Sequence, residues 1–193
     1  MTESNQIEYF YNDDSENLIN FIFKKGVNNL LCVSLNPKET DEQKEITENI
    51  EKLCLHNGFD GFAIIFLNPT ITNEIISLEK SRQDINDNYL MIGALLLGDE
   101  FKFKKTLVCW GEEIESYNQT FLKESAFIVI NDLEKENLDF VCIGTDSSGN
   151  PLSINENNFK NNLKKFNFKD YNANIKRTVK LTPEITINGI EFK

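Results

Sequence analysis

Short runs of apolar residues alternate with stretches of helical periodicity along this chain. The apolar runs are continuous, which is typical of strands that are buried on both faces. We predict strands over residues 30–35, 62–67, 106–110 and 140–143. We predict helices over residues 15–25, 40–57, 86–97, 112–123 and 158–166. This succession predicts an α/β fold: a three-layer α/β/α sandwich with a mostly parallel sheet of four or five strands.

The same pattern sets the expected domain organisation. Residues 1–26 form a polar lead-in and a helix, which Ser15 can cap and Gly26 can end. Residues 27–154 form the α/β core, and residues 155–193 form a C-terminal extension that packs on it. The end of the extension alternates apolar and polar residues around an Asn-Gly pair, which predicts a terminal β-hairpin.

Composition agrees with a globular protein that has no membrane segment. The 193 residues are 40% hydrophobic. The longest apolar candidate, residues 89–97, is far shorter than the roughly 20 residues that a membrane span requires. The N-terminus is acidic and lacks the basic and apolar regions of a signal peptide. We therefore predict a cytoplasmic protein.

The four cysteines are predicted to be buried, reduced thiols. Cys32, Cys109 and Cys142 lie inside apolar runs, and Cys54 lies on the apolar face of a helix. The sequence has no CxxC spacing and a single histidine, His56, so it lacks the clustered ligands of a zinc site. No metal and no cofactor are predicted.

Net charge disfavours nucleic acid as a partner. The formal charge is −11, and a chain with this charge repels phosphates. Residues 157–180 are an exception, with seven lysines and arginines against one aspartate. This segment is either a local basic strip that contacts nucleic acid or an ordinary solvated face.

Polar residues and glycines follow four of the predicted strands. They are Asn36-Pro37, Asn68-Pro69-Thr70, Trp110-Gly111 and Gly144-Thr145-Asp146. Ligands bind outside the carboxyl ends of parallel strands, so we expect these residues to line one crevice. Asparagine can pair with a nucleobase edge, tryptophan can stack on a planar ring, and the helix that starts after Pro37 can attract an anion. The alternative is that Asn and Pro are ordinary turn residues and that Trp110 belongs to the core.

Motifs of standard reactions are absent from the sequence. It contains no GxGxxG, GxxxxGK[ST], GxSxG or HExxH. His56 lies near the end of a predicted helix and is interpreted as a surface or capping residue. Asp41 and Asp87 lie near helix starts and are the candidates for acid/base chemistry.

Five segments in this order resemble a bacterial and phage family, domain of unknown function family 1643. They are LNP followed by TD, NGFDGFAIIFLNP, INDNYL, LVCWG and IGTDSSGNPL, within residues 27–154. The resemblance carries over Asn36, Pro37, Asp41, Gly58, Asn86, Asp87, Trp110, Gly111, Gly144, Gly149 and Pro151.

The chain departs from that family at two motifs. LNPST is replaced by LNPKET, and the histidine of the closing motif falls on Ser153, with its neighbouring proline on Ile154. If the family is catalytic through that histidine, this chain acts differently. The arrangement is also similar, more distantly, to the uracil-DNA glycosylase fold, which implies a pocket of nucleobase size.

These observations predict binding, with or without processing, of a nucleobase- or nucleotide-like small ligand. The expected ligand-binding residues are Asn36, Pro37, Asn68, Asn86, Trp110, Gly111, Thr145 and Ser153. The main alternative is a non-enzymatic acidic interaction protein of phage or mobile-element type that binds a basic protein partner. An open, polar crevice favours the first hypothesis, and a filled crevice favours the second. A third hypothesis, an enzyme acting on DNA or RNA, requires the 157–180 strip to lie beside the crevice.

Overall fold

A computed structural model describes most of the chain. The described residues are 6–12, 15–74, 78, 82–98, 102–118 and 120–171. The predicted terminal hairpin and the last part of the 157–180 basic segment lie outside these residues. Within them, no helix has the length and apolarity needed to cross a membrane.

The described residues form seven strands, three α-helices and a 3₁₀ helix. The strands are β1 (Glu8–Asn12), β2 (Ser15–Lys24), β3 (Asn29–Ser34), β4 (Gly61–Phe66), β5 (Phe103–Val108), β6 (Asp139–Cys142) and β7 (Lys164–Lys165). The helices are α1 (Thr40–His56), α2 (Arg82–Leu97), the 3₁₀ helix η2 (Glu112–Asn118) and α3 (Thr120–Lys135).

One sheet joins all seven strands, in the order β1-β2-β4-β3-β5-β6-β7. The four inner strands β4, β3, β5 and β6 are parallel. The outer strands β1, β2 and β7 pair antiparallel to their neighbours. The α/β class is confirmed, but the mostly parallel sheet of four or five strands is wrong, because the sheet has seven strands and is mixed.

The N-terminal segment is part of this sheet. The helix predicted over residues 15–25 is wrong: the segment is strand β2, which hydrogen-bonds to β4. The lead-in contains β1, which pairs with β2 as a hairpin. Apolar residues of β2 are buried against both faces of the sheet, including Ile22 in one cluster and Phe21 and Phe23 in the other. A strand buried on both faces lacks period-two alternation, so its apolar spacing is easily taken for that of a helix.

Two further helix predictions are corrected. Residues 112–123 do not form one helix, because they contain the whole of η2 and the start of α3, which continues to Lys135. Residues 158–166 form turns and the short strand β7. Asparagines cause the second difference: the Asn155 amide donates to Asn158 Oδ1 (2.9 Å), and Asn158 Nδ2 donates to the Ser153 carbonyl (2.8 Å). Such local bonds compete with helical ones.

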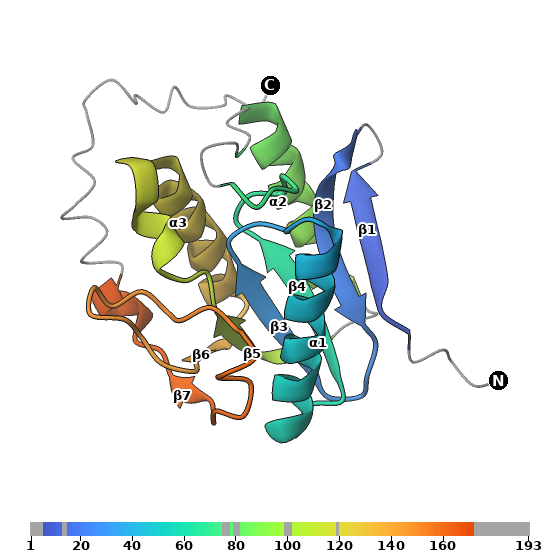
Figure 1. Cartoon of the computed structure of the whole chain (residues 1–193), viewed down its shortest axis with the longest axis vertical. Helices are drawn as coiled ribbons and strands as arrows, with labels where there is room; N and C mark the ends of the chain where they lie inside the picture. Colours follow the sequence, from blue (N-terminus) through green and yellow to red (C-terminus); the bar gives the residue numbers. More distant parts are fainter. Residues whose placement is uncertain are drawn as a thin grey trace.

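Helices cover both faces of the sheet and give three layers (Figure 1). One apolar cluster packs between the sheet and the helices α2 and α3, where Val33 of β3 shares the cluster with Ile92 and Leu133. The other packs against α1, where Cys32 of β3 lies with Leu53. All four cysteines are buried and free of disulfides, as predicted.

Candidate functional site

The inner strands create a topological switch point between β3 and β5. The chain passes from β3 to β4 on one side and then returns across β3 to β5 on the other. The two connections leave the sheet edge in opposite directions, which opens a crevice at the carboxyl ends of these strands. A cavity of about 570 Å³ lies there. Its volume is within the range of small-molecule sites.

Four segments that are distant in sequence line the crevice. Residues 34–38 follow β3, residues 109–113 follow β5, residues 42–50 come from α1, and residues 153–155 come from the loop after β6. The predicted crevice residues Asn36, Trp110 and Ser153 are among the lining residues. Lys38, Glu42, Gln43, Glu45, Asn49 and Glu113 also line it and were not predicted.

Asn49 is the most buried of the polar crevice residues whose side chains form no hydrogen bond among the described residues. It is 3% exposed and lies on the face of α1 that also carries Ile46 and Ile50. No hydrogen bond links its side chain to another residue that the structure describes. Its amide atoms are not among the fully buried, unpaired side-chain atoms of the described residues, so they are accessible from the crevice. An unpaired polar group that lines a cavity is therefore a candidate ligand contact.

Asn36 has a more limited role than the sequence predicts. Its Nδ2 donates to the carbonyls of Pro37 and Thr72, both at 2.8 Å. These bonds tie the loop after β3 to the loop after β4, so the donors of Asn36 are used within the chain. Its Oδ1 is buried and has no donor partner in the described part of the chain. Both polar atoms of the Asn36 side chain are therefore closed to a ligand, and Pro37 is buried outside the crevice lining.

The crevice is acidic. Glu42, Glu45 and Glu113 line it against a single cation, Lys38. Lys38 Nζ lies 3.4 Å from Glu113 Oε2, so its charge already faces a carboxylate. Since carboxylates outnumber the cation, a ligand with a positive or uncharged polar group is favoured over an anion.

The N-terminus of α1 is also unsuited to an anion, contrary to the expectation from Pro37. The first turn carries Asp41 and Glu42, whose charges already complement the helix dipole. The Lys38 amide donates to Gln43 Oε1 (2.8 Å). The Glu39 amide donates to Asn73 Oδ1 (3.0 Å). These two bonds hold the segment that precedes the helix, and no side chain caps the first turn itself.

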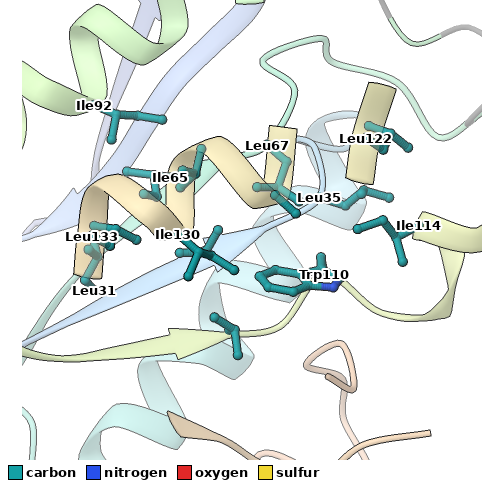
Figure 2. Packing of buried hydrophobic residues seen from close by; sticks show 14 of the residues in the cluster. Leu31, Leu35, Ile65, Leu67, Ile92, Trp110, Ile114, Leu122, Ile130 and Leu133 are labelled. Atoms are coloured by element: carbon teal, nitrogen blue, oxygen red, sulfur yellow. The ribbon is translucent and has the colours of Figure 1, made fainter. Parts of the chain in front are cut away.

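Trp110 belongs to the core, as the alternative interpretation held. It is 1% exposed and lies among apolar side chains such as Ile114 and Ile130 (Figure 2). Its Nε1 donates to the Tyr171 hydroxyl, which donates to Asn150 Oδ1, both at 3.1 Å. No ring face is open for a ligand to stack on. Trp110 forms a wall of the crevice and anchors the segment that carries Tyr171.

Gly111 lies outside the crevice lining and packs against Ser153, which lines it. Gly111 has φ 76°, in the left-handed region that favours glycine. Its amide donates to the Pro151 carbonyl (2.9 Å), and a Cβ at this position would lie 3.3 Å from Ser153 Cβ. The close approach that glycine permits is therefore to the chain's own loop. Ser153 is exposed at the crevice and replaces the histidine that the resemblance leads one to expect.

The remaining predicted site residues lie outside the crevice lining. Asn68 is fully buried, and its Oδ1 accepts from the Thr70 amide (3.0 Å). Asn86 is exposed and Asp87 half-buried on α2, and Asp41 is exposed on the first turn of α1. Thr145 lines a separate hollow of about 660 Å³ beside β6 and β7. The strand ends are thus not all gathered into one site.

The Cys109 thiol and the possible metal ligands of the described residues are candidate sources of reactivity. Burial raises the pKa of Cys109, which lines the crevice, to about 12. The thiol is therefore protonated at neutral pH and is not an activated nucleophile. Among the described residues, no group of three or more His, Cys, Asp or Glu side chains is placed to hold a metal ion.

Comparison with known proteins identifies no family for the chain. No family model, no curated protein and no solved structure matches the chain, and the resemblance carried by its motifs stays a prediction.

Proposed function

We propose that this protein binds a small molecule of nucleobase or nucleoside size in the crevice between β3, β5 and α1. The observation that carries the proposal is Asn49, a buried amide that lines the crevice with its hydrogen-bonding groups unpaired among the described residues. Apolar neighbours such as Ile46 and Ile50 supply a surface for a flat ring. Polar residues outnumber these apolar ones in the lining, so the crevice suits a ligand that combines a ring with several polar groups.

The charge of the crevice narrows the class of ligand that the sequence predicts. Three carboxylates face one lysine, and the first turn of α1 carries its own acids. This argues for a base or nucleoside rather than a nucleotide. It also argues against the nucleic-acid hypothesis, since none of the lysines of the described part of the 157–180 segment lines the crevice.

A thermal-shift screen of the whole chain tests the proposal. The panel contains bases, nucleosides, nucleotides and short single-stranded DNA. A ligand at a hundred times its Kd adds about 2.7 kcal/mol to the free energy of unfolding. For a domain of this size the unfolding temperature rises by roughly 5 to 10 °C. The shift is expected with bases or nucleosides and is expected to disappear in Asn49→Ala; no shift with any compound contradicts the proposal.

A second candidate is the acidic interaction protein. The exposed side of α1 carries Asp41, Glu45 and Glu48, which a basic protein partner can contact. Two variants separate the hypotheses in a binding assay with a lysine-rich peptide. Binding that is lost in Glu48→Gln and retained in Asn49→Ala supports the interaction protein, whereas no binding of the peptide removes this candidate.

A further inference from the structure

We infer that the crevice selects a phosphate-free heterocycle that bears an amino group, of the aminopyrimidine or aminopurine class, held by Asn49 and selected by the surrounding carboxylates. The inference rests on the proposed function and narrows its ligand class. The evidence for this ligand class is the unpaired amide of Asn49 and the carboxylates of Glu42 and Glu45 in the crevice lining.

Carboxylates are the charged acceptors that the crevice leaves open. Glu42 and Glu45 line it and form no ion pair among the described residues, and carboxylate oxygens only accept hydrogen bonds. A ligand that satisfies these groups must bring donors. An exocyclic amine supplies two N–H groups, whereas each carbonyl of a diketo ring adds another acceptor.

Asn49 supplies the complementary pair. A side-chain amide presents a donor and an acceptor side by side, and this pair matches the amino group and ring nitrogen of adenine or cytosine. The same amide also pairs with the N–H and carbonyl of a uracil-like ring, so Asn49 alone does not discriminate between the two. Carboxylates accept from an amino group and repel a carbonyl oxygen, so Glu42 and Glu45 make the selection.

The same carboxylates exclude a phosphate. The crevice has one lysine, and Lys38 Nζ lies 3.4 Å from a glutamate oxygen. A phosphorylated ligand would add negative charge beside Glu42 and Glu45 without an unpaired cation to receive it.

Calorimetric titration of the full-length protein tests the inference, with adenosine, cytidine, uridine, AMP and CMP at low salt. We expect adenosine or cytidine to bind at least tenfold more tightly than uridine. The monophosphate of the preferred nucleoside is expected to bind at least tenfold more weakly than the nucleoside itself. Uridine binding equally well, or a monophosphate binding as tightly, overturns the inference and leaves the proposed function intact. Binding of none of the five compounds overturns the inference, and the wider screen then decides the proposed function.

Variants that replace one glutamate of α1 by glutamine test which carboxylate selects the amino-bearing nucleoside. Glu45→Gln is expected to reduce both the preference for the amino-bearing nucleoside and the penalty on its monophosphate, each by at least threefold. Glu48→Gln is the matched control, because it removes the same charge from an exposed position of the same helix outside the crevice lining. Equal effects of the two variants would mean that net charge, not contact, sets the preference, and would overturn the role assigned to Glu45.

Discussion

Two equally buried asparagines, Asn29 near the amino ends of the parallel strands and Asn49 beside the crevice, differ in their hydrogen bonds. At the amino end, Asn29 is 4% exposed, its Oδ1 accepts from the Gly26 amide (2.8 Å) and its Nδ2 donates to the Gly26 carbonyl (3.0 Å). Beside the crevice, Asn49 is equally buried and has no such partner among the described residues. Asn29 stabilises a turn through its two hydrogen bonds, whereas the Asn49 side chain forms no hydrogen bond that stabilises the fold among the described residues. Burial of a polar residue therefore does not identify a site; an unsatisfied one beside a cavity does.

The amino end is also packed more closely. The start of β4 meets the turn between β2 and β3, and a Cβ at Gly61 would lie 2.0 Å from Asn29 Oδ1 and 2.3 Å from the Gly26 amide nitrogen. The carboxyl end instead leaves a cavity of about 570 Å³. The amino end is thus filled by its own chain, whereas the carboxyl end leaves space beside β3 and β5.

The largest expected effect is that of Gly61→Ala. The added methyl meets backbone atoms that cannot move independently, so the free energy of unfolding should fall by about 3 kcal/mol. Urea denaturation measures the change. Gly93→Ala in α2 is the matched control, because a Cβ at Gly93 meets no atom within 4 Å. The control should gain about 0.5 to 1 kcal/mol, and equal stabilities of the two variants would contradict the close packing at the amino end.

The next largest effect is that of Asn29→Ala. The change removes two hydrogen bonds and leaves the Gly26 amide and carbonyl without their partner. We expect a loss of about 2 kcal/mol in the free energy of unfolding. A loss below about 0.5 kcal/mol, the size of an ordinary surface substitution, would show that the turn does not depend on Asn29.

The same substitution beside the crevice should leave stability almost unchanged. Asn49→Ala removes an amide with no partner among the described residues and places a better helix former in α1, so stability should rise by about 0.5 kcal/mol. Thermal unfolding without ligand measures this. A clear destabilisation would mean that Asn49 has a structural role, and the comparison between the two asparagines would fail.

The smallest effect is a pH dependence at the amino end. Asp60 Oδ1 accepts from the Asn28 amide (2.7 Å), and this hydrogen bond, with a second from Val27, lowers the pKa of Asp60 below its ordinary value of 3.8. A lowered folded-state pKa stabilises the fold above the ordinary value, and that stability is lost as the pH falls through the lowered one. Asp60→Asn keeps an acceptor but cannot titrate. As the pH is lowered below about 4, the free energy of unfolding of the variant should fall less than that of the natural protein. Urea denaturation at several pH values measures this, and an equal fall in the two proteins would rule out this contribution of Asp60.

Part of the fold could be predicted from local pattern. Helix α1 and strands β3, β4 and β6 lie where the sequence predicts them, because each has a continuous or periodic apolar pattern bounded by turn residues. Strand β2 was missed because burial on both faces removes the alternation that identifies a strand. Strand β7 was missed because two residues carry no pattern at all.

The site was predictable in position but not in composition. A crevice at the ends of β3 and β5 follows from the order of the parallel strands, and Asn36, Trp110 and Ser153 do line the cavity there. Asn49 was missed, although a polar residue on the apolar face of α1 was a signal that could have been used. Glu45 carried no signal, since exposed glutamates are common on helices.

The sequence by itself determined the α/β class, the burial of the strands and of the four cysteines, and the sheet edge at which a ligand site would form. These properties depend on hydrophobicity and on neighbours a few residues away. Only the tertiary structure decided which polar groups remain open. Asn36 finds its partner Thr72 36 residues along the chain, and Trp110 finds Tyr171 61 residues away. A polar side chain is available to a ligand only if no distant residue of the same chain already bonds to it. Folding brings these distant partners together, so local sequence does not reveal them.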